Sequence, residues 1–518
     1  MKKPPLKKFY DLIRFVLLTT FIFYISMLLL DYYLPSSNHG ISFFFFNITA
    51  TNHTQVRKPS TISINSSEIR NYTTIVNATH HEGEIRKNNL SPPPPPPPPL
   101  NITKNIEVVA KPPKEKFDPC SGRYVYSYDL PSIFNEDLVK DCKSLNKWFN
   151  MCPYLSNLGL GERVIEKSRR KVLLKNSWYV TNQFSLEVIF HEIMKHYKCL
   201  TNDSSLASAI YVPYYPGLDV GKYLWDFSIS RRDETPKKLM NWLREKAEWK
   251  KMMGKDHFMV GGRTGFDFRR GSEDESDWGT KLMFMPEASK MAILPIESSS
   301  WDNDFPIPYP TYFHPSKDKE ILQWQERMRK MKRNYLFSFA GAPRPNSTYS
   351  IRNDLIHHCK TSKSCKLLDC YVNNINYCDD PVHVIHVFQL SVFCLQPPGD
   401  SYTRRSTFDS ILAGCIPVFF HPNSAYKQYL WHLPKNGSSY SVFIPQQDVQ
   451  TKRTIIQDTL SRFSKEQVLA MREQVIRMIP SIIYRKPGSR LEKFEDAFDV
   501  AVKGVIQRIE GIKRKELL

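Results

Sequence analysis

Several features of nucleic-acid-binding proteins are missing from this 518-residue chain. It has no zinc-finger spacing, no RNP-like aromatic motif and no long block of lysine and arginine. The 72 basic side chains nevertheless exceed the 52 acidic ones, which gives a net charge of +20. Without a recognition motif this charge does not indicate nucleic acid, and it fits an anionic membrane surface or an acidic polymer better.

A metal-binding acidic motif is also missing from the places where it would be expected. No Asp-x-Asp follows a predicted strand, and the triplet Asp302-Asn-Asp304 lies between a serine run and prolines. The sequence therefore does not require a bound metal ion, and we expect none.

The N-terminal region has a single apolar run but no small-x-small cleavage site after it. Residues 15–30 carry no charge and follow a basic segment, residues 1–14. This pattern favours an uncleaved signal anchor over residues 15–34, with the basic side in the cytosol and the remaining chain in the lumen.

Residues 35–116 show no sustained helical or strand period, and they include eight consecutive prolines, Pro92–Pro99. We expect a disordered, proline-rich stem. Seven Asn-x-Ser/Thr triplets in the stem and three in the folded body predict N-glycosylation on the luminal side. The predicted acceptors are Asn47, Asn52, Asn65, Asn71, Asn77, Asn89, Asn101, Asn202, Asn346 and Asn436.

The ten cysteines suit an oxidising compartment. Cys359, Cys365, Cys370 and Cys378 lack the two-residue spacer of structural zinc sites, so we expect disulfides among them and leave their pairing open. Cys394 and Cys415 lie within predicted strands, and we expect both to be buried free thiols.

The body alternates strand and helix patterns, which predicts an α/β fold with parallel sheets. We place an N-terminal domain at residues 117–315, a C-terminal domain at 316–480 and a C-terminal helix at 481–518. The sequence Ser391–Phe420 contains a complete strand, loop, helix and strand unit.

The loop in this unit offers the groups of an anion site. Two adjacent arginines at a helix start are unfavourable unless an anion lies nearby, although they could also be solvated. The earlier loop Gly341–Arg344 repeats the pattern. The predicted substrate-binding residues in these two loops and the following helix are Gly341, Arg344, Gly399, Ser401, Thr403, Arg404, Arg405 and Asp409.

The same stretch carries the pattern S-x-F-C-L-x-P-x-G-D-S, an R-R pair and D-S-I-L-A-G-C-I-P-V. It resembles the signature of exostosin-like glycosyltransferases, in particular the plant xyloglucan galactosyltransferase clade. Four further segments are similar to this clade: Tyr128-Asp-Leu-Pro, Asn182-Gln-Phe, His257-Phe-x-x-x-Gly-Arg and Phe339-Ala-Gly-Ala-Pro-Arg-Pro. In the segment after Gly262-Arg263, Phe266 stands where the pattern of the clade has tryptophan.

The resemblance implies two facing Rossmann-like domains of GT-B type, the first for the acceptor and the second for the nucleotide sugar. It implies a type II Golgi membrane enzyme that transfers galactose from UDP-galactose to xylosyl residues of xyloglucan with inversion. Complexes with other Golgi glycosyltransferases are expected partners. A galacturonosyl- or arabinosyltransferase, or a catalytically silent glycan-binding scaffold, remains the alternative.

Inverting transfer needs a base for the acceptor hydroxyl and a group that stabilises the departing UDP. We assign the second task to Arg405, supported by Arg404 and Arg344, because guanidinium groups match phosphate oxygens. The candidate bases are Glu187, Asp219, His191 and His257. Gln183 shares a predicted helix row with Glu187 and His191, which could instead be a solvated stripe, and Arg263 is expected to contact phosphate or acceptor.

Overall fold

The computed structural model describes residues 118–166, 171–299, 302–344, 350–372 and 375–516. All of these lie in one compact unit, Glu115–Leu518. The predicted tail, anchor and stem lie outside the described residues. Within the described part of the chain, no helix combines the length and the apolar character that a membrane span needs.

The first half of the unit is built on a sheet of five parallel strands in the order β2-β1-β3-β4-β5. Its strands are β1 (Tyr124–Ser127), β2 (Leu200–Thr201), β3 (Ala207–Tyr211), β4 (His257–Thr264) and β5 (Ala292–Glu297). The helices of this lobe, which we call the N-lobe, are α2 (Glu136–Lys140), α3 (Cys152–Leu155), α4 (Leu186–Met194), α5 (Pro216–Tyr223), α6 (Ile229–Arg232), α7 (Glu234–Glu245) and α8 (Ala247–Met252).

Both faces of this sheet are covered, which is why its strands are apolar without interruption. Along β4, Phe258 and Val260 belong to one hydrophobic cluster, whereas Met259 belongs to another. Helix α4 supplies the first cluster, and helix α7 supplies the second. The period of two along each strand thus distributes its side chains between two cores.

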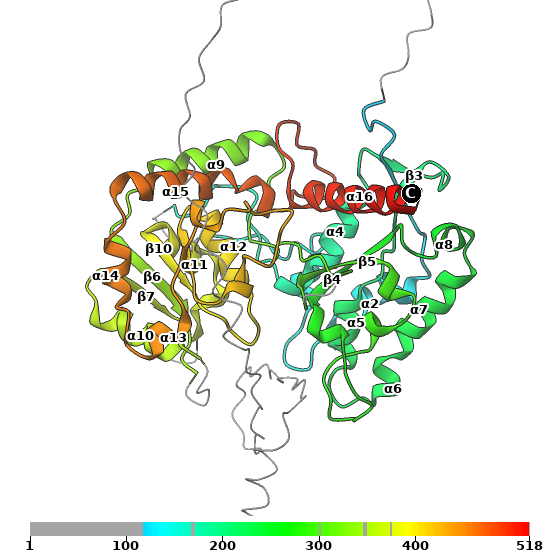
Figure 1. Cartoon of the computed structure of the whole chain (residues 1–518), viewed down its shortest axis with the longest axis horizontal. Helices are drawn as coiled ribbons and strands as arrows, with labels where there is room; N and C mark the ends of the chain where they lie inside the picture. Colours follow the sequence, from blue (N-terminus) through cyan, green and yellow to red (C-terminus); the bar gives the residue numbers. More distant parts are fainter. Residues whose placement is uncertain (1–117, 167–170, 300–301, 345–349, 373–374, 517–518) are drawn as a thin grey trace, which may run out of the picture. The chain divides into compact units, whose positions relative to one another are not determined.

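The second half, the C-lobe, repeats this plan with the order β12-β11-β10-β6-β7, again with all neighbours parallel. Figure 1 labels β6, β7 and β10 of this sheet. Its strands are β6 (Tyr335–Gly341), β7 (Cys365–Asp369), β10 (Ser391–Gln396), β11 (Ile416–Phe419) and β12 (Val442–Phe443). Its helices are α9 (Asp318–Lys330), α10 (Arg352–Thr361), α11 (Pro381–Gln389), α12 (Arg405–Leu412), α13 (Gln446–Gln450), α14 (Ile456–Ser461) and α15 (Lys465–Arg477).

A short antiparallel pair, β8 (Tyr371–Val372) and β9 (Ile375–Asn376), lies between β7 and α11. The prediction of an α/β fold with parallel sheets is confirmed, and the unit over Ser391–Phe420 forms as predicted. Helix α12 ends at Leu412, and Gly414, two residues later, has a φ of +64°, a left-handed conformation that glycine adopts without strain.

The two sheets have the same strand order. In each, the second strand in chain order forms one edge and pairs with the first, and the third, fourth and fifth strands follow on the other side of the first. This order is that of a doubly wound sheet, in which the winding direction reverses between the first and third strands. The reversal falls between β1 and β3 in the N-lobe and between β6 and β10 in the C-lobe. Each lobe therefore has one place where two strand-to-helix loops diverge.

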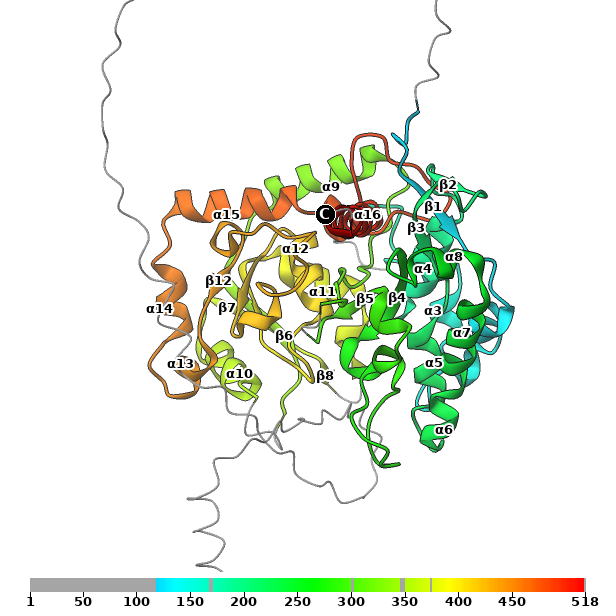
Figure 2. The same cartoon turned by 45° about the vertical axis from the view of Figure 1, so that its right-hand side comes forward.

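The C-terminal helix α16 (Ala497–Glu516) returns from the C-lobe to the N-lobe, where it contacts β3 (Figure 2). The ring of Phe498 lies 4.6 Å from that of Phe190 on α4. Arg485, just before α16, bonds the carboxylates of Asp496 and Asp499 at 2.8 Å each. One hydrophobic cluster consequently includes residues of both lobes and of α16.

Five disulfides join all ten cysteines: Cys120–Cys199, Cys142–Cys152, Cys359–Cys365, Cys370–Cys378 and Cys394–Cys415. The prediction of disulfides among the four cysteines at 359–378 is confirmed. The prediction that Cys394 and Cys415 are free thiols is wrong, because parallel pairing of β10 with β11 brings the middle of one strand beside the start of the other.

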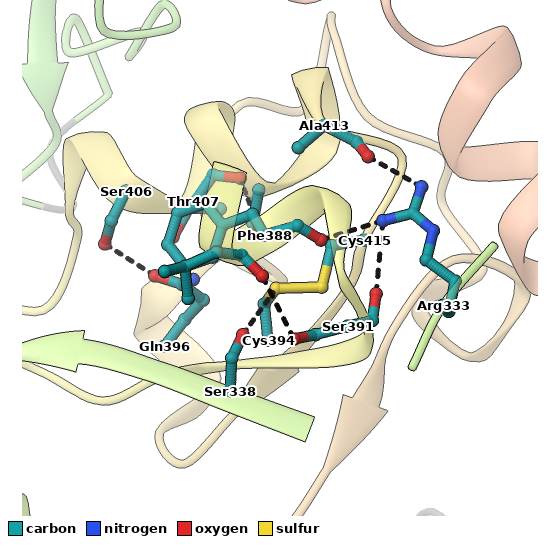
Figure 3. Close-up of a disulfide and its surroundings, with 12 residues drawn as sticks. Arg333, Ser338, Phe388, Ser391, Cys394, Gln396, Ser406, Thr407, Ala413 and Cys415 are labelled. Carbon is teal, nitrogen blue, oxygen red and sulfur yellow. Dashed lines mark hydrogen bonds between the residues drawn. A yellow bond between two sulfur atoms is a disulfide. The ribbon is translucent and has the colours of Figure 1, made fainter. Parts of the chain in front are cut away.

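Figure 3 shows this last disulfide among buried polar groups. The hydroxyl of Ser338 on β6 lies 3.3 Å from the Cys394 sulfur, and Ser406 on α12 donates to Gln396 at 2.6 Å. The guanidinium of Arg333 donates to the carbonyls of Phe388 and Ala413 at 2.7 Å each. The disulfide thus lies in the layer that supports the loop after β10.

We expect the double variant Cys394→Ala, Cys415→Ala to lose about 3 kcal/mol of unfolding free energy from the open loop alone, plus lost core packing. Denaturant unfolding of the variant and the wild type measures the difference in unfolding free energy. The control is Cys142→Ala, Cys152→Ala, a half-buried pair that should cost less. An equal or smaller loss in the Cys394 and Cys415 variant would contradict this account.

Candidate functional site

The two loops predicted to bind an anion lie side by side at the winding reversal of the C-lobe sheet. After β6 the chain runs through α10 to β7, and after β10 it runs through α12 to β11, on the opposite side. Ligands of doubly wound sheets bind beyond the carboxyl ends of the strands at this point. The tertiary structure therefore brings Gly341–Arg344 together with residues 397–404.

Three guanidinium groups converge between these loops, from Arg344, from Arg352 at the start of α10, and from Arg404 before α12. Arg344 forms an ion pair with Asp400. Burial, followed by repulsion from Arg404 and Arg344, lowers the pKa of Arg352 to about 8. A small pocket is lined by Phe339, Ala340, Arg352, Leu395, Pro397, Arg404 and Ser406.

Charge in this cluster is not balanced by its own carboxylates. The pKa of Arg404 is lowered by burial and by Arg344, and it is raised by Asp400 and, less, by Glu297. Three cations thus face two carboxylates in a partly buried setting, where repulsion between like charges is stronger than in water. A bound anion would relieve that repulsion.

Gly399 explains how two of the guanidinium groups fit against one loop. A methyl group at this position would lie 1.6 Å from Nη1 of Arg404 and 2.8 Å from Nη2 of Arg352. Any larger residue would therefore displace the Arg404 side chain. Gly341, at the end of β6, is similarly restricted, because a methyl group added at this position would lie 2.5 Å from the Phe339 ring.

Ser401 and Thr403 direct their hydroxyl groups toward the N-lobe. Both donate to Oε2 of Glu297, at 2.7 Å and 2.5 Å, and the Thr403 amide donates to the same oxygen at 2.7 Å. In this geometry the two hydroxyls are not free to donate to a phosphate. Their predicted part in substrate binding stays a prediction, and their observed part is to hold the loop.

Arg405 spans the two lobes. Its Nη1 donates to the carbonyl oxygen of Thr181, and its guanidinium carbon lies 3.6 Å from the centroid of the Tyr312 ring. Its Nε is 3.5 Å from Asp409 on the next turn of α12. Burial raises the pKa of Asp409 to about 6, and Arg405 opposes this rise.

Within the described residues, Nε and Nη2 of Arg405 and Oδ1 of Asp409 are buried without a hydrogen-bond partner. Buried polar atoms normally have one, so these atoms have capacity left for a ligand. This agrees with the predicted use of Arg405 for the leaving group and of Asp409 for a sugar hydroxyl, both of which stay predictions.

In the N-lobe, the predicted row of polar residues is divided between two elements. Gln183 begins a short 3-10 helix, η4 (Gln183–Ser185), and Glu187 and His191 lie on α4. Glu187 is fully buried and accepts the amides of Gly217 at 2.5 Å, Gly262 at 2.7 Å and Leu218 at 3.2 Å. Burial raises the pKa of Glu187 to about 8. The carboxylate thus joins the start of α5 to β4, and Gln183 lies half-buried one turn earlier.

His191 and Asp219 are also buried and bonded within the N-lobe. His191 Nδ1 lies 2.8 Å from the Tyr215 hydroxyl, and burial lowers the pKa of His191 to about 3. Asp219 accepts the Tyr214 hydroxyl at 2.8 Å, and burial raises its pKa to about 6. Both residues lie near Glu187 in the fold, because Glu187 contacts the first turn of α5, which carries Asp219.

His257 and Arg263 lie at opposite ends of β4. Arg263 is near the carboxyl end, donates to the Gly217 carbonyl at 3.0 Å and stacks 4.3 Å from the centroid of Phe184. His257 begins the strand, with Nδ1 2.7 Å from Asp256 and Nε2 3.0 Å from the Tyr128 hydroxyl. The structure brings Arg263 together with Glu187 and leaves His257 at the far edge of the sheet.

The Asp302-x-Asp304 pair does not present two open carboxylates. Asp304 accepts the Ser299 amide at 2.7 Å and lies 3.6 Å from Arg269. Among the described residues, no group of three His, Cys, Asp or Glu side chains is arranged to hold a metal ion. Asn202 and Asn436 are exposed, and the other predicted glycosylation sites lie outside the described residues.

Sequence reasoning missed two residues of this region, Arg352 and Glu297. Arg352 begins a helix, as Arg405 does, so the argument about cations at helix N-termini could have identified it. Glu297 ends a short apolar strand, Ala292–Glu297, and nothing in the sequence connects it with a loop more than 100 residues later.

The chain is similar in sequence to a known protein family and to several named relatives. The family model described as "Exostosin GT47 domain" matches residues 119–459. The probable xyloglucan galactosyltransferase GT12 of Arabidopsis thaliana is 53% identical, over 77% of this chain and 79% of that protein. The xyloglucan galactosyltransferase MUR3 of Arabidopsis thaliana is 54% identical, over 77% of this chain and 64% of that protein.

A third relative from Arabidopsis thaliana, xyloglucan-specific galacturonosyltransferase 1, is 40% identical over 76% of this chain and 58% of that protein. The resemblance drawn from the sequence motifs is thereby confirmed. The matched range includes both sheets, the arginine cluster and the Glu187 region.

The raised pKa of Glu187 predicts a pH dependence of stability. Between pH 4.5 and about 8 the folded chain keeps a proton that the unfolded chain releases, so stability falls as pH rises through this window. Glu187→Gln cannot ionise. Its melting temperature should therefore fall less than that of the wild type between pH 5 and pH 8.

Glu192→Gln is the matched control for this experiment, because Glu192 lies on the same helix and pairs with Lys195. It should keep the wild-type dependence on pH. Parallel melting curves for Glu187→Gln and the wild type would show that Glu187 does not carry the effect.

Proposed function

Because the chain belongs to the exostosin GT47 family, we propose that it transfers galactose from UDP-galactose to xylosyl residues of xyloglucan side chains, with inversion. Two relatives whose names state xyloglucan galactosyltransferase activity, one of them qualified as probable, support the donor and the acceptor. Family membership, which the motifs indicated, makes the chain a glycosyltransferase.

The observation that carries the proposal is the arginine cluster at the winding reversal of the C-lobe. Arg344, Arg352 and Arg404 gather more positive charge than the neighbouring carboxylates offset. A diphosphate supplies the missing negative charge, and guanidinium groups match its oxygens in pairs. The C-lobe is accordingly the donor lobe, the N-lobe the acceptor lobe, and the two sheets form a GT-B arrangement.

In the transfer, an acceptor hydroxyl oxygen forms a bond to the anomeric carbon of galactose while the bond from that carbon to UDP breaks. The hydroxyl proton passes to a base, and the electron pair of the broken bond leaves on the diphosphate. The cluster, with the unpartnered atoms of Arg405, stabilises this developing charge without a metal ion. Asp409 accepts a hydroxyl of the ribose or the sugar.

The four candidate bases are all in the N-lobe. Glu187, Asp219, His191 and His257 all bond groups of the N-lobe itself. His257 also lies at the sheet edge opposite the ligand-binding one. The present geometry favours supporting roles for these four residues, and their assignment as bases stays a prediction.

We place the enzyme in the Golgi membrane, with residues 15–34 as a type II anchor and the compact unit in the lumen. The disulfides agree with this, because such bonds persist in oxidising compartments. Other Golgi glycosyltransferases are the proposed protein partners.

The test is release of UDP by the full chain, purified in detergent, with a xyloglucan oligosaccharide acceptor. UDP-galactose, UDP-galacturonic acid and UDP-arabinose are compared, each with and without a chelator. We expect turnover with UDP-galactose that survives the chelator. Preference for UDP-galacturonic acid would instead support the activity in the third relative's name, and no turnover with any donor would support the silent scaffold.

The arginine cluster generates a second prediction. Gly399→Ala should raise the KM for the donor by roughly tenfold or more, because its methyl group displaces Arg404 and weakens charge-assisted bonds worth about 1.5–3 kcal/mol each. Arg352→Ala should have a similar effect, since it removes one of the three cations. Initial rates at varied donor concentration measure both.

Gly511→Ala is the matched control, because a methyl group there meets nothing within 4 Å in helix α16. It should leave the donor KM unchanged and slightly raise stability. A donor KM in Gly399→Ala equal to that of this control would remove the cluster from the donor site.

A further inference from the structure

The end of β5 is joined residue by residue to the C-lobe. The Tyr429 hydroxyl donates to the Ile296 carbonyl at 2.7 Å, and Gln428 accepts the Ser298 amide at 2.9 Å. Between them, Glu297 accepts the three donors of Ser401 and Thr403. Because these residues follow one another along a strand, the position of Glu297 relative to the loop after β10 is tightly defined.

Glu297 combines burial with an unusual concentration of donors. Its exposed fraction is 6%, and all three hydrogen bonds end on one carboxylate oxygen, Oε2. The Tyr309 hydroxyl lies 3.0 Å from Oγ1 of Thr403 and extends the network into the segment between β5 and α9. Hydrogen bonds to an ionised group are about twice as strong as neutral ones, so this network resists rearrangement.

Ser401 and Thr403, which Glu297 binds, are next in sequence to Asp400 and Arg404 of the charged cluster. Asp400, which pairs with Arg344, precedes Ser401, and Arg404 follows Thr403. Fixing Ser401 and Thr403 therefore fixes the backbone from which Asp400 and Arg404 project. The loop also has an internal backbone hydrogen bond, from the Gly399 amide to the Ser401 carbonyl at 2.8 Å.

We propose that Glu297 of the acceptor lobe is a positioning residue for the donor site: it holds the loop 400–404 so that Arg404 and the Arg344–Asp400 pair meet the diphosphate. This inference rests on the proposed function, since it needs a diphosphate donor. It adds that the donor site is incomplete without the other lobe. Glu297 does not touch the reacting atoms, and its effect passes through Thr403 and Ser401.

The consequence is a selective loss of donor affinity. Glu297→Gln keeps the size of the side chain but removes the charge, so the three bonds weaken and the loop loosens. We expect the KM for UDP-galactose and the Kd for UDP each to rise by roughly tenfold. The KM for the xyloglucan oligosaccharide should stay within about twofold, because the acceptor lobe keeps its fold.

Glu320→Gln is the matched control. Glu320 also accepts several donors across elements, from the Ser177 hydroxyl at 2.8 Å and from the amides of Ser316 at 2.6 Å and Lys317 at 3.2 Å. It caps α9, and in the part of the chain that the structure describes it makes no hydrogen bond to the loop 400–404. It should lower the melting temperature without changing the donor KM.

A double-mutant cycle separates positioning from general stability. Thr403→Val removes the hydroxyl donor with little change in shape, and it is combined with Glu297→Gln. If the two side chains act through one bond, their effects on the UDP Kd are not additive, and the double variant is little worse than the poorer single variant. Additive effects would contradict the proposed coupling.

Titration calorimetry with UDP on the purified full chain distinguishes the possible failures. If the wild type binds UDP and Glu297→Gln binds it equally well, the positioning role is refuted and the proposed function stands. A fall in kcat of roughly a thousandfold or more at unchanged donor KM would also refute it, because that loss is typical of a group acting in the transition state. A wild type that does not bind UDP would overturn both proposals.

Discussion

Repulsion among clustered guanidinium groups is the constraint on which the candidate site of this structure depends. Arg344, Arg352 and Arg404 lie at one edge of a parallel sheet, where Arg352 is buried and the other two are partly buried, so that water screens their charges less than at the surface. Such an arrangement is unfavourable on its own account, and the fold holds it through Gly399, Asp400 and the contact with Glu297. The three guanidinium groups exceed the two neighbouring carboxylates, Asp400 and Glu297, by one charge, and an anionic ligand would balance it.

The two lobes are not independent supports for this site. Glu297, at the end of β5 in the N-lobe, accepts hydrogen bonds from the C-lobe loop that carries Arg404. Arg405 of the C-lobe donates to the carbonyl of Thr181 in the N-lobe. A shared hydrophobic cluster and the returning helix α16 make these contacts part of one compact unit. The proposed donor site and the packing between the lobes therefore share the same contacts.

The local pattern of the chain was sufficient for much of the fold. Apolar runs interrupted by glycine and proline predicted the strand, loop, helix and strand unit over Ser391–Phe420, which the structure shows as β10, α12 and β11. The motifs also identified the exostosin family. The cysteines show where such reasoning ends: Cys394 and Cys415 looked like isolated core residues, and only the neighbouring positions of β10 and β11 bring their sulfur atoms together.

By itself, the sequence determined the alternation of strands and helices, the family and the two loops with arginines, because periodicity, glycine placement and short motifs are local properties. The tertiary structure decided which distant residues meet. It paired Glu297 with Thr403, added Arg352 to the cluster and enclosed Glu187 among backbone amides, whereas His257 fell at the opposite end of its strand. Contacts of this kind depend on strand order and on the packing of one lobe against the other, and neither is written in any single stretch of the chain.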